Sequence, residues 1–364
     1  FSEIKNKIQK IIPEGIDYDI DLEAGSISVI TKEPASFGGA GGQSLTVKIA
    51  KAIRRRVVIR PHPDLLSSES EVNDAVSRIM PEEALIRRIW LDPALSEVTI
   101  EADDPKSAVG QKGTNIQQLR NEIGWLVNVV RAPARESRTQ TDIRRFRKEL
   151  ADERKTLLRK FGTRIYRPQR PGPSWVRVTA LGSYREVGRA MHLVTTNESK
   201  VLVDCGAKPT NNRSEVQPFF AAPEMLPLDN IDAVVITHAH VDHIGMLPVL
   251  FKYGYKGPVY CTQPTRDLMT LLQMDYIKVA QAEGNDPPYS KSDIQECIKH
   301  VVDINWGEKT DIAPDIKMTM ENAGHILGSS SVYMQIGEGR NEHKLLFSGD
   351  IKYEKSWLLS LIHI

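Results

Sequence analysis

The sequence predicts an α/β (α+β) protein in which two small α/β units precede a larger sandwich of sheets and covering helices. The order helix, strand, strand, helix, strand occurs twice before residue 132, which indicates a tandem repeat with a period of about 70 residues. From Trp175 onward short strands alternate with helices, and no G-x-G-x-x-G motif opens the first helix. A chain of 364 residues is also long enough to bury more than one core.

The first α/β unit is expected at residues 1–64. Ile4 and Ile8 fall at helical spacing, and two alternating segments follow them before a second helix and a third strand. The expected elements are a helix over 4–12, strands over 16–22 and 26–31, a helix over 45–53 and a strand over 56–60.

The second unit is expected at residues 65–135, and the turn before its second helix is Gly110-Gln111-Lys112-Gly113. This turn resembles the G-x-x-G loop of KH domains, where glycines let single-stranded phosphates come close and a lysine adds positive charge. We therefore predict that these four residues bind single-stranded RNA. The expected elements are a helix over 71–79, strands over 85–91 and 97–102, a helix over 115–123 and a strand over 126–130.

Two features of the first unit have a weaker connection with RNA. Gly38-Gly-Ala-Gly41 occupies the corresponding loop but contains no basic residue, so a structural loop is favoured over an RNA contact. The run Arg54-Arg-Arg56 either contacts phosphate or forms the solvated end of a helix, and the sequence leaves both readings open.

Residues 136–174 are expected to form a basic helical linker. Residues 131–170 contain 14 Arg and Lys against 5 Asp and Glu, a local balance of 14 − 5 = +9 within a chain of net charge +1. Apolar residues share one face over 141–161, which predicts an amphipathic helix. That helix either tracks RNA or packs its apolar stripe between domains, and the proline-rich segment 167–173 ends it.

A cluster of metal-ligating residues follows the apolar strand expected at 231–237. His238 and His240 are two residues apart in an extended loop, so both rings can face one ion. Asp242 and His243 stand at the start of the next helix and can reach a second ion. A chance origin of this H-x-H-x-D-H pattern is improbable in a chain with nine histidines.

Further ligand candidates lie at strand ends and turns. His325 stands in a glycine-flanked turn, and Asp350 ends an apolar strand, where a bridging carboxylate would hold two cations about 3.5 to 4 Å apart. A strand-end aspartate is also often a turn former, so that reading stays open for Asp350. Two cations would activate a water molecule, and Asp242 either shares its proton or acts only as a ligand. Asp204 either orients a ligand histidine or forms a turn.

Several classes of protein are disfavoured by composition. Cys205, Cys261 and Cys297 form no C-x-x-C pair, which argues against a disulfide framework and a thiolate zinc site. No apolar run approaches the roughly 20 residues that span a bilayer, and the N-terminus lacks a signal-peptide pattern. We expect a soluble, cytoplasmic protein with no membrane partner.

These motifs together resemble the β-CASP branch of the metallo-β-lactamases. The resemblance rests on the 238–243 loop, Asp204, His325, Asp350 and the segment 182–189. With two KH units in front, the order is similar to that of archaeal homologues of cleavage and polyadenylation specificity factor. This implies an RNA-binding, zinc-dependent ribonuclease, an endonuclease with 5′-exonuclease activity left open, in RNA 3′-end processing and transcription termination.

The resemblance also implies roles for individual residues. Two Zn²⁺ ions are expected in the full-length protein, and His243, Asp242 and Asp204 take part in catalysis. Single-stranded RNA is the implied partner, with a homodimer of the full-length protein and the transcription machinery left open. The ligands implied are His238, His240 and His325 for one ion, Asp242 and His243 for the other, and Asp350 for both.

This chain departs from the family after Asp350, where a β-CASP domain and further histidines are expected. We therefore expect residues 175–364 to be the first part of an αββα metallo-β-lactamase domain in a C-terminally truncated chain, with weak activity or none. Two other functions remain open. One is a small-molecule metallo-hydrolase on the same scaffold, and the other is a non-catalytic RNA-binding protein.

Overall fold

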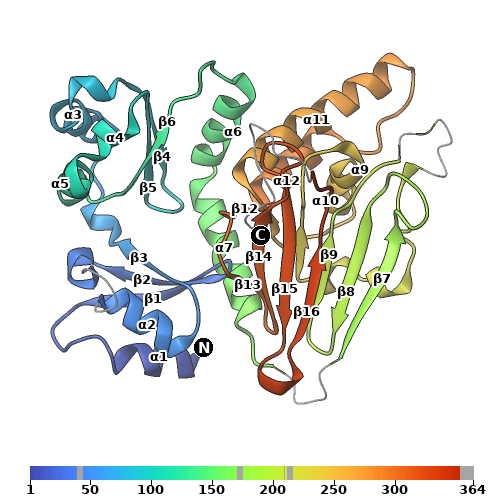
Figure 1. Cartoon of the computed structure of the whole chain (residues 1–364), viewed down its shortest axis with the longest axis horizontal. Helices are drawn as coiled ribbons and strands as arrows, with labels where there is room; N and C mark the ends of the chain where they lie inside the picture. The colour runs from blue at the N-terminus through green and yellow to red at the C-terminus, as the bar shows by residue number, and fades with distance from the viewer. Residues whose placement is uncertain (39–43, 170–174, 209, 211–215, 353–364) are drawn as a thin grey trace. The chain divides into compact units, whose positions relative to one another are not determined.

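The computed structural model describes residues 1–38, 44–169, 175–208, 210 and 216–352. The chain divides into two compact units, Phe1–Arg159 and Lys160–Ile364. Each unit has a buried apolar core of its own, and Figure 1 shows the chain coloured by residue number. Most of the glycine-rich loop expected at 38–41 lies outside the described residues.

The first unit contains two three-stranded sheets with the same strand order and directions. In each sheet the first two strands are antiparallel, and the second and third are parallel with helix between them. The expected repeat of one α/β order is therefore present. The first copy comprises α1 (Ser2–Gln9), β1 (Tyr18–Glu23), β2 (Ser26–Thr31), α2 (Leu45–Ile53) and β3 (Val57–Pro61). The second comprises α3 (Glu69–Ile79), β4 (Ile86–Asp92), β5 (Glu97–Ala102), α4 (Pro105–Val109), α5 (Thr114–Ile123) and β6 (Leu126–Arg131).

The helix α4 is absent from the elements expected from sequence. Its five residues are too few to show a helical period, but its start follows the usual chemistry. The Asp104 carboxylate accepts a hydrogen bond of 3.1 Å from the backbone N–H of Lys106, and Pro105 supplies a preset φ at the first helical position. The short helix delivers the chain into the Gly110–Gly113 turn.

The basic segment forms two helices, α6 (Arg138–Glu149) and α7 (Ala151–Ile165), instead of the single helix expected over 141–161. The break falls at Leu150, whose φ of −98° and ψ of 23° leave the helical region. Within the first unit, three of its arginines pair with acidic residues of the two sheets. The pairs are Arg144 with Glu101, Arg154 with Asp92 and Arg159 with Asp21. These contacts favour packing over a free RNA-tracking surface for those side chains.

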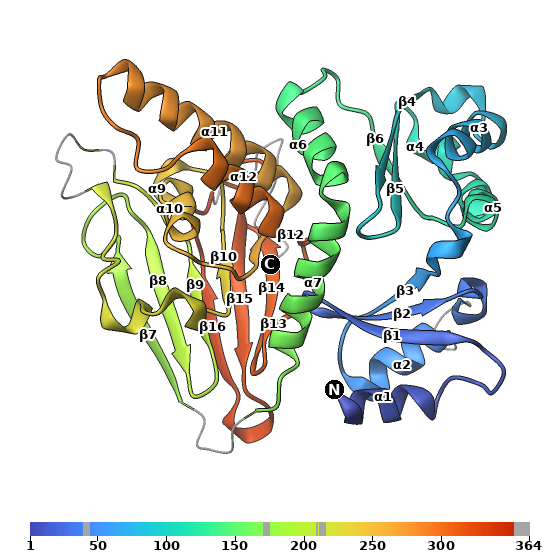
Figure 2. The same ribbon diagram turned by 180° about the vertical axis from the view of Figure 1, so that it is seen from behind.

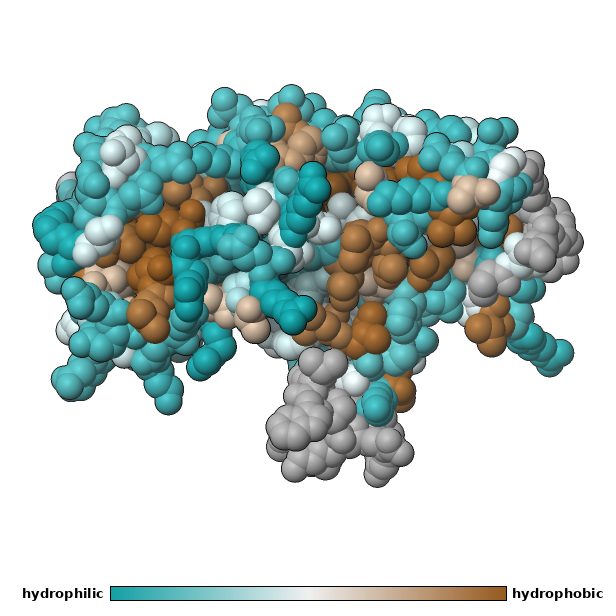
Figure 3. Space-filling view, turned by 90° about the horizontal axis from the view of Figure 1, so that it is seen from above, coloured by the Kyte–Doolittle hydropathy of each residue, from teal (hydrophilic) through white to brown (hydrophobic). Residues whose placement is uncertain are grey.

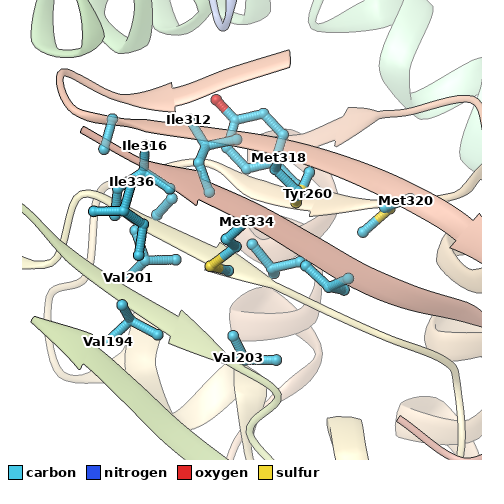
Figure 4. Close-up of a cluster of buried hydrophobic side chains, with 14 of the residues drawn as sticks. Val194, Val201, Val203, Tyr260, Ile312, Ile316, Met318, Met320, Met334 and Ile336 are labelled. Carbon is cyan, nitrogen blue, oxygen red and sulfur yellow. The ribbon is translucent and has the colours of Figure 1, made fainter. Parts of the chain in front are cut away.

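The second unit is a sandwich of a six-stranded and a four-stranded sheet, and its core lies between them. Figure 4 shows Val201 and Val203 of one sheet beside Met318 and Met334 of the other, all fully or almost fully buried. The first sheet has the order β12 (Val301–Asp303), β11 (Val259–Cys261), β10 (Ala233–Val235), β9 (Lys200–Val203), β8 (Met191–Thr196) and β7 (Val176–Gly182). The second has β13 (Thr310–Ala313), β14 (Ile316–Asn322), β15 (Ser330–Ile336) and β16 (His343–Phe347).

In the part of the chain that the structure describes, four helices accompany the six-stranded sheet. Helix α12 packs against both α10 and α11, and α11 also contacts α9 and β12 (Figure 2). The chain after β10 forms two short helices, α9 and α10, with a break between them at Gly245 and Met246. The bounds are α9 (Val241–Ile244), α10 (Leu247–Lys252), α11 (Gln263–Ala282) and α12 (Lys291–His300).

Strand direction positions the candidate site. Strands β9, β10 and β11 are parallel neighbours, so their carboxyl ends meet at one edge of the sheet. Asp204 follows β9, the segment from Ile236 follows β10, and Thr262 follows β11. Ligands and active sites of α/β sheets commonly lie beyond the carboxyl ends of their strands.

The surface carries both polar and apolar side chains, which form teal and brown areas in Figure 3. Isolated exposed apolar residues are normal on protein surfaces and mark no site by themselves. Among the described residues, no helix combines the length and the apolar character needed to cross a bilayer.

Candidate metal centre

The H-x-H-x-D-H segment turns from the end of β10 into α9. His240 is the N-terminal cap residue of α9, so Asp242 and His243 lie within its single turn. The segment after β9 lies directly against this turn: Cys205 N–H donates to the carbonyl oxygen of His243 at 2.8 Å. Only glycine fits at position 206, because a Cβ there would stand 1.5 Å from the carbonyl oxygen of Asp242.

Four side chains converge on one point in the pattern of a metal site. His240 Nδ1 lies 3.1 Å from His238 Nε2 and 3.1 Å from His325 Nε2. Asp350 Oδ2 lies 3.7 Å from His238 Nε2 and 3.5 Å from His325 Nε2. Four ligands at about 2.0 to 2.1 Å from a tetrahedral zinc would be separated by about 3.3 Å. The spacing and the nitrogen and oxygen donors therefore fit one zinc-sized cation.

A second group of ligand atoms lies on the other side of Asp350. His243 Nε2 is 3.5 Å from Asp350 Oδ1 and 3.9 Å from Asp242 Oδ2. The two oxygens of Asp350 thus face different histidines, His238 and His325 on one side and His243 on the other. This arrangement can bridge two cations, although the second group has fewer ligand atoms than the first.

Asp204 and Thr237 fix the orientation of the His238 and His243 rings by contacting their Nδ1 atoms. Asp204 Oδ2 lies 2.8 Å from His243 Nδ1, which leaves Nε2 of that ring facing Asp242 and Asp350. The Thr237 hydroxyl contacts both Asp204 oxygens and lies 3.0 Å from His238 Nδ1. A carboxylate behind a ligand histidine selects its tautomer and orientation. Asp204 has a φ of 60°, and backbone strain of this kind is concentrated at functional sites.

The electrostatics of the two groups differ. Burial, then the neighbouring rings of His243, His240 and His325, lowers the pKa of His238 to about 2. Its imidazole is therefore neutral, as a metal ligand must be. Burial also lowers the pKa of His243, but Asp204, Asp242 and Asp350 outweigh it and raise that pKa to about 9. The negative potential that favours a proton on His243 favours a cation there as well.

The depth of the site is uneven. The side chains of His238 and His243 are 1% and 9% exposed, whereas those of His325 and Asp350 are 26% and 46% exposed. The floor of the cluster is thus closed by protein, and one side opens to solvent.

All six predicted metal residues and Asp204 are therefore brought together by the fold. Thr237 has no counterpart among the residues expected from sequence. Its only sequence signal is its place between a buried strand and the first ligand histidine, and threonine is too common at strand ends for that place to be diagnostic.

The predicted RNA turn belongs to the first unit. Gly110, Lys112 and Gly113 have φ values of 76°, 53° and 80°, so the turn uses the left-handed region that glycine adopts without strain. Gln111 and Lys112 are exposed, and the turn joins α4 to α5. Positive charge and open backbone at this place are compatible with phosphate contact. At the end of α2, Arg54 also has a left-handed φ of 54° and caps the helix.

Comparison with protein families agrees with this architecture. Residues 193–362 match the metallo-β-lactamase superfamily domain, and residues 1–66 match the KH domain of transcription termination factor FttA. Residues 193–362 therefore belong to the metallo-β-lactamase superfamily, behind an N-terminal KH domain. This confirms the fold class expected from sequence.

Two curated relatives carry the same name. The chain is 43% identical to transcription termination factor FttA of Methanosarcina mazei over 98% of its length, and this covers 55% of that protein. It is 40% identical to transcription termination factor FttA of Methanothermobacter thermautotrophicus, over 98% of this chain and 56% of that protein. The chain thus spans about 55% of the length of these relatives. A solved structure, the FEZ-1 metallo-β-lactamase from Legionella gormanii, aligns with 53% of this chain and 69% of its own. The sequence identity is 16% and the TM-score is 0.34, and this similarity is too low to support an argument.

Proposed function

We propose that the chain is the RNA-binding, metal-dependent part of a ribonuclease that hydrolyses phosphodiester bonds of single-stranded RNA. The observation that carries the proposal is the convergence of His238, His240, His325 and Asp350, with ligand atoms within 4.8 Å of one another. The superfamily hosts many hydrolases, so the substrate has to come from other features. The KH domain and the Gly110–Gly113 turn favour RNA.

The geometry of the side chains supports the roles that we propose for them. Bound divalent cations, with zinc favoured by the histidine and carboxylate donors, would activate water and neutralise charge on a phosphoryl oxygen. His238, His240 and His325 would hold one cation, Asp242 and His243 the other, and Asp350 both. Asp204 and Thr237 keep His243 Nε2 turned toward the cluster. Asp242, with a side chain 29% exposed, is placed to share a proton with water at the open side.

The wider context is proposed from the relatives. Their name, transcription termination factor, supports a role in RNA 3′-end formation and termination, with the transcription machinery as a partner. Endonuclease and 5′-exonuclease activity, a homodimer and a cytoplasmic location are proposed for the whole protein, of which this chain represents about 55% of the length. We propose domains at 1–64, 65–135 and 175–364, with 136–174 as the helical linker.

The metal mechanism is tested with a labelled single-stranded RNA, with and without chelator, using this chain and the full-length protein, each with and without His240→Ala. We expect cleavage to need the metal and to fall at least about 100-fold in the variant, since a ligand is lost. His343→Ala is the matched control, because His343 is exposed at the start of β16, whereas Asp350 follows the opposite end of that strand. Cleavage that ignores both chelator and His240→Ala would falsify the metal mechanism.

The same proteins separate the alternatives. Hydrolysis of thioesters or lactones without RNA cleavage would indicate a small-molecule hydrolase. RNA binding without metal-dependent turnover would indicate a binding protein.

The RNA-binding role of the Gly110–Gly113 turn is tested by substitution. Gly113→Asp should weaken RNA binding, and Gly15→Asp is the matched control, because both glycines have a positive φ and open space around the missing Cβ. Equal RNA affinity of both variants would remove the turn from the RNA surface.

A further inference from the structure

His325 lies in a loop, residues 323–329, that joins β14 to β15. Hydrogen bonds within the loop define part of its conformation. The Ser329 hydroxyl accepts hydrogen bonds from the backbone N–H groups of His325 at 3.1 Å and Ile326 at 3.2 Å. Ala323 N–H donates to the Ser329 carbonyl oxygen at 3.1 Å. These bonds define the curvature of the loop, but they do not attach it to the sheet edge where His238 and His240 lie.

A second set of contacts attaches the loop to the start of α11. The carbonyl oxygen of Gly328 lies 2.7 Å from the Thr262 hydroxyl and 3.0 Å from the Thr265 hydroxyl. Both threonines are buried, with 4% and 0% exposure. A carbonyl oxygen has two lone pairs, so both hydroxyls can donate to it at once. Thr262 directly follows β11, at the sheet edge that also carries Asp204 and the His238 loop.

The approach of the loop to this helix end is close. A Cβ at Gly328 would stand 2.7 Å from the Thr262 hydroxyl oxygen and 2.8 Å from the backbone nitrogen of Thr265, and φ at Gly328 is 83°. Glycine is therefore needed at 328 for the carbonyl to reach both hydroxyls. The loop backbone is seated on the N-terminus of α11 by shape as well as by hydrogen bonds.

Helix capping alone does not account for both threonines. Thr262 is the N-cap of α11, and its hydroxyl also accepts from the Thr265 backbone N–H at 3.4 Å. Thr265 is the third residue of α11, so no helical turn precedes it; further along a helix, threonine usually returns its hydroxyl to the carbonyl of the preceding turn. Thr270 does this, donating to the Arg266 carbonyl oxygen at 2.9 Å. The Thr265 hydroxyl points instead to a loop 63 residues further along the chain.

We propose that Thr262 and Thr265 are positioning residues that hold the His325 loop, and through it the third histidine of the first ligand group, at the metal centre. The inference rests on the proposed metal-dependent function. His325 is the one histidine of its group that does not come from the 238–243 segment, so its position depends on how its loop is fastened. His240 Nδ1 lies 3.1 Å from His325 Nε2, and a shift of the loop changes that separation directly.

The test is the affinity of the whole chain for Co²⁺, followed by the absorption of the bound ion and by competition with a chromophoric chelator. Thr265→Val keeps the shape of the side chain and removes its hydroxyl. We expect Co²⁺ affinity to fall by about tenfold, at the lower end of the range for residues that orient ligands. The absorption spectrum should change, because the donor set around Co²⁺ is distorted. Thr265→Ser, which restores the hydroxyl, should recover most of the affinity.

Thr270→Val is the matched control, since it removes a buried threonine hydroxyl from the same helix without touching the loop. It should leave Co²⁺ affinity and spectrum unchanged. Thermal unfolding of each variant in chelator shows whether the fold is retained. Thr262→Ser is a milder change at the helix cap, because serine keeps the hydroxyl. A Thr265→Val protein that binds Co²⁺ like the parent overturns the positioning role. His240→Ala in parallel separates the two proposals, because unchanged Co²⁺ binding in that variant would defeat the metal centre itself.

Discussion

Asp204 acts on the cluster through other side chains. Its carboxylate is 4% exposed, contacts His243 Nδ1 at 2.8 Å and accepts the Thr237 backbone N–H at 2.8 Å. The carboxylate thereby determines which nitrogen of His243 faces Asp242 and Asp350. The same side chain joins the end of β9 to the end of β10, so its charge and its geometry both matter.

Asp204→Asn is expected to keep the shape and lose the charge behind His243. We expect RNA cleavage and Co²⁺ affinity to fall by about 10- to 100-fold, as for other carboxylates that orient ligand histidines. The measurement is single-turnover cleavage together with Co²⁺ titration. Asp315→Asn is a suitable comparison. The Asp315 carboxylate accepts a hydrogen bond from the Ser199 hydroxyl, and neither residue belongs to the two ligand groups. Loss of equal size in both variants would mean that Asp204 has only a structural role.

His300, at the end of α12, gives the fold a pH dependence of its own. Burial lowers the pKa of His300 from its ordinary value of 6.5, so the folded protein keeps the ring neutral while the unfolded chain takes up a proton as the pH falls. The free energy of unfolding should therefore decrease below pH 6.5, by at most about 1.4 kcal/mol per pH unit. Chemical denaturation between pH 7 and 5, in chelator, should show a shallower slope for His300→Leu. Identical slopes would contradict this.

Site residues that are close together in the sequence or belong to a known motif could be predicted, whereas those that are connected to the site only in the folded structure could not. His238 to His243 could be found because four ligand candidates lie within six residues. His325 and Asp350 could be found from a turn, a strand end and a family resemblance. Thr237, Thr262 and Thr265 could not, since threonine is frequent in strands and at helix caps, and only the fold shows which hydroxyl meets which acceptor.

At the level of elements, the segment after β9 and the turn α9 form one structure. Gly206 N–H donates to the Ala190 carbonyl oxygen at 3.0 Å, and Ala207 N–H donates to that of Val241 at 2.9 Å. Cys205 N–H also donates to the His243 carbonyl oxygen, so three successive residues after β9 are hydrogen-bonded to α9 or to the residue that precedes β8. The ligands Asp242 and His243 are thus held by backbone contacts that no side-chain pattern reveals.

Gly206→Ala should disturb both the fold and the ligands, because its Cβ has no room beside Asp242. We expect the free energy of unfolding to fall by about 2 to 3 kcal/mol, with weaker Co²⁺ binding. Gly284→Ala, at a positive φ but in open space after α11, should cost about 1 kcal/mol and leave Co²⁺ binding unchanged. Denaturation and Co²⁺ titration of the two variants measure the difference, and equal losses would refute it.

The elements missed from sequence are the shortest or least regular ones. Strands β12 and β13 have three and four residues, and neither lies in a longer apolar run like the one that marks the equally short β10. The break at Leu150 in the basic segment has no glycine or proline to signal it. Longer elements such as α11 and β14 could be predicted because several periods of the pattern are present.

On the scale of the whole first unit, Arg60 of β3 connects the two α/β copies. Its guanidinium is 8% exposed and contacts Glu23 of the first copy at 2.9 Å, and Glu97 and the Leu95 carbonyl oxygen of the second at 2.7 and 2.6 Å. The copies are therefore joined by a buried ion network within the unit. Their sheets should unfold together.

Arg60→Met should weaken that connection. Removing one member of a buried ion network leaves charges without partners, and we expect a loss of about 2 to 3 kcal/mol, reduced because Glu23 and Glu97 keep some access to water. Hydrogen exchange followed by mass spectrometry should then show β1–β3 opening independently of β4–β6. Arg159→Met, which removes a 60% exposed partner of Asp21, should cost at most about 1 kcal/mol. Unchanged joint protection in Arg60→Met would exclude the connection.

The uneven depth of the metal centre has a kinetic consequence. His238 and His243 are buried, so an ion would arrive and depart past the more exposed side chains of Asp350, Asp242 and His325. A chelator would meet those three side chains first, and the rate of metal loss should depend on how firmly their segments are held more than on the buried rings. Under the proposed function, RNA would reach the cations through the same opening, and a bound strand would slow the escape of the ions beneath it.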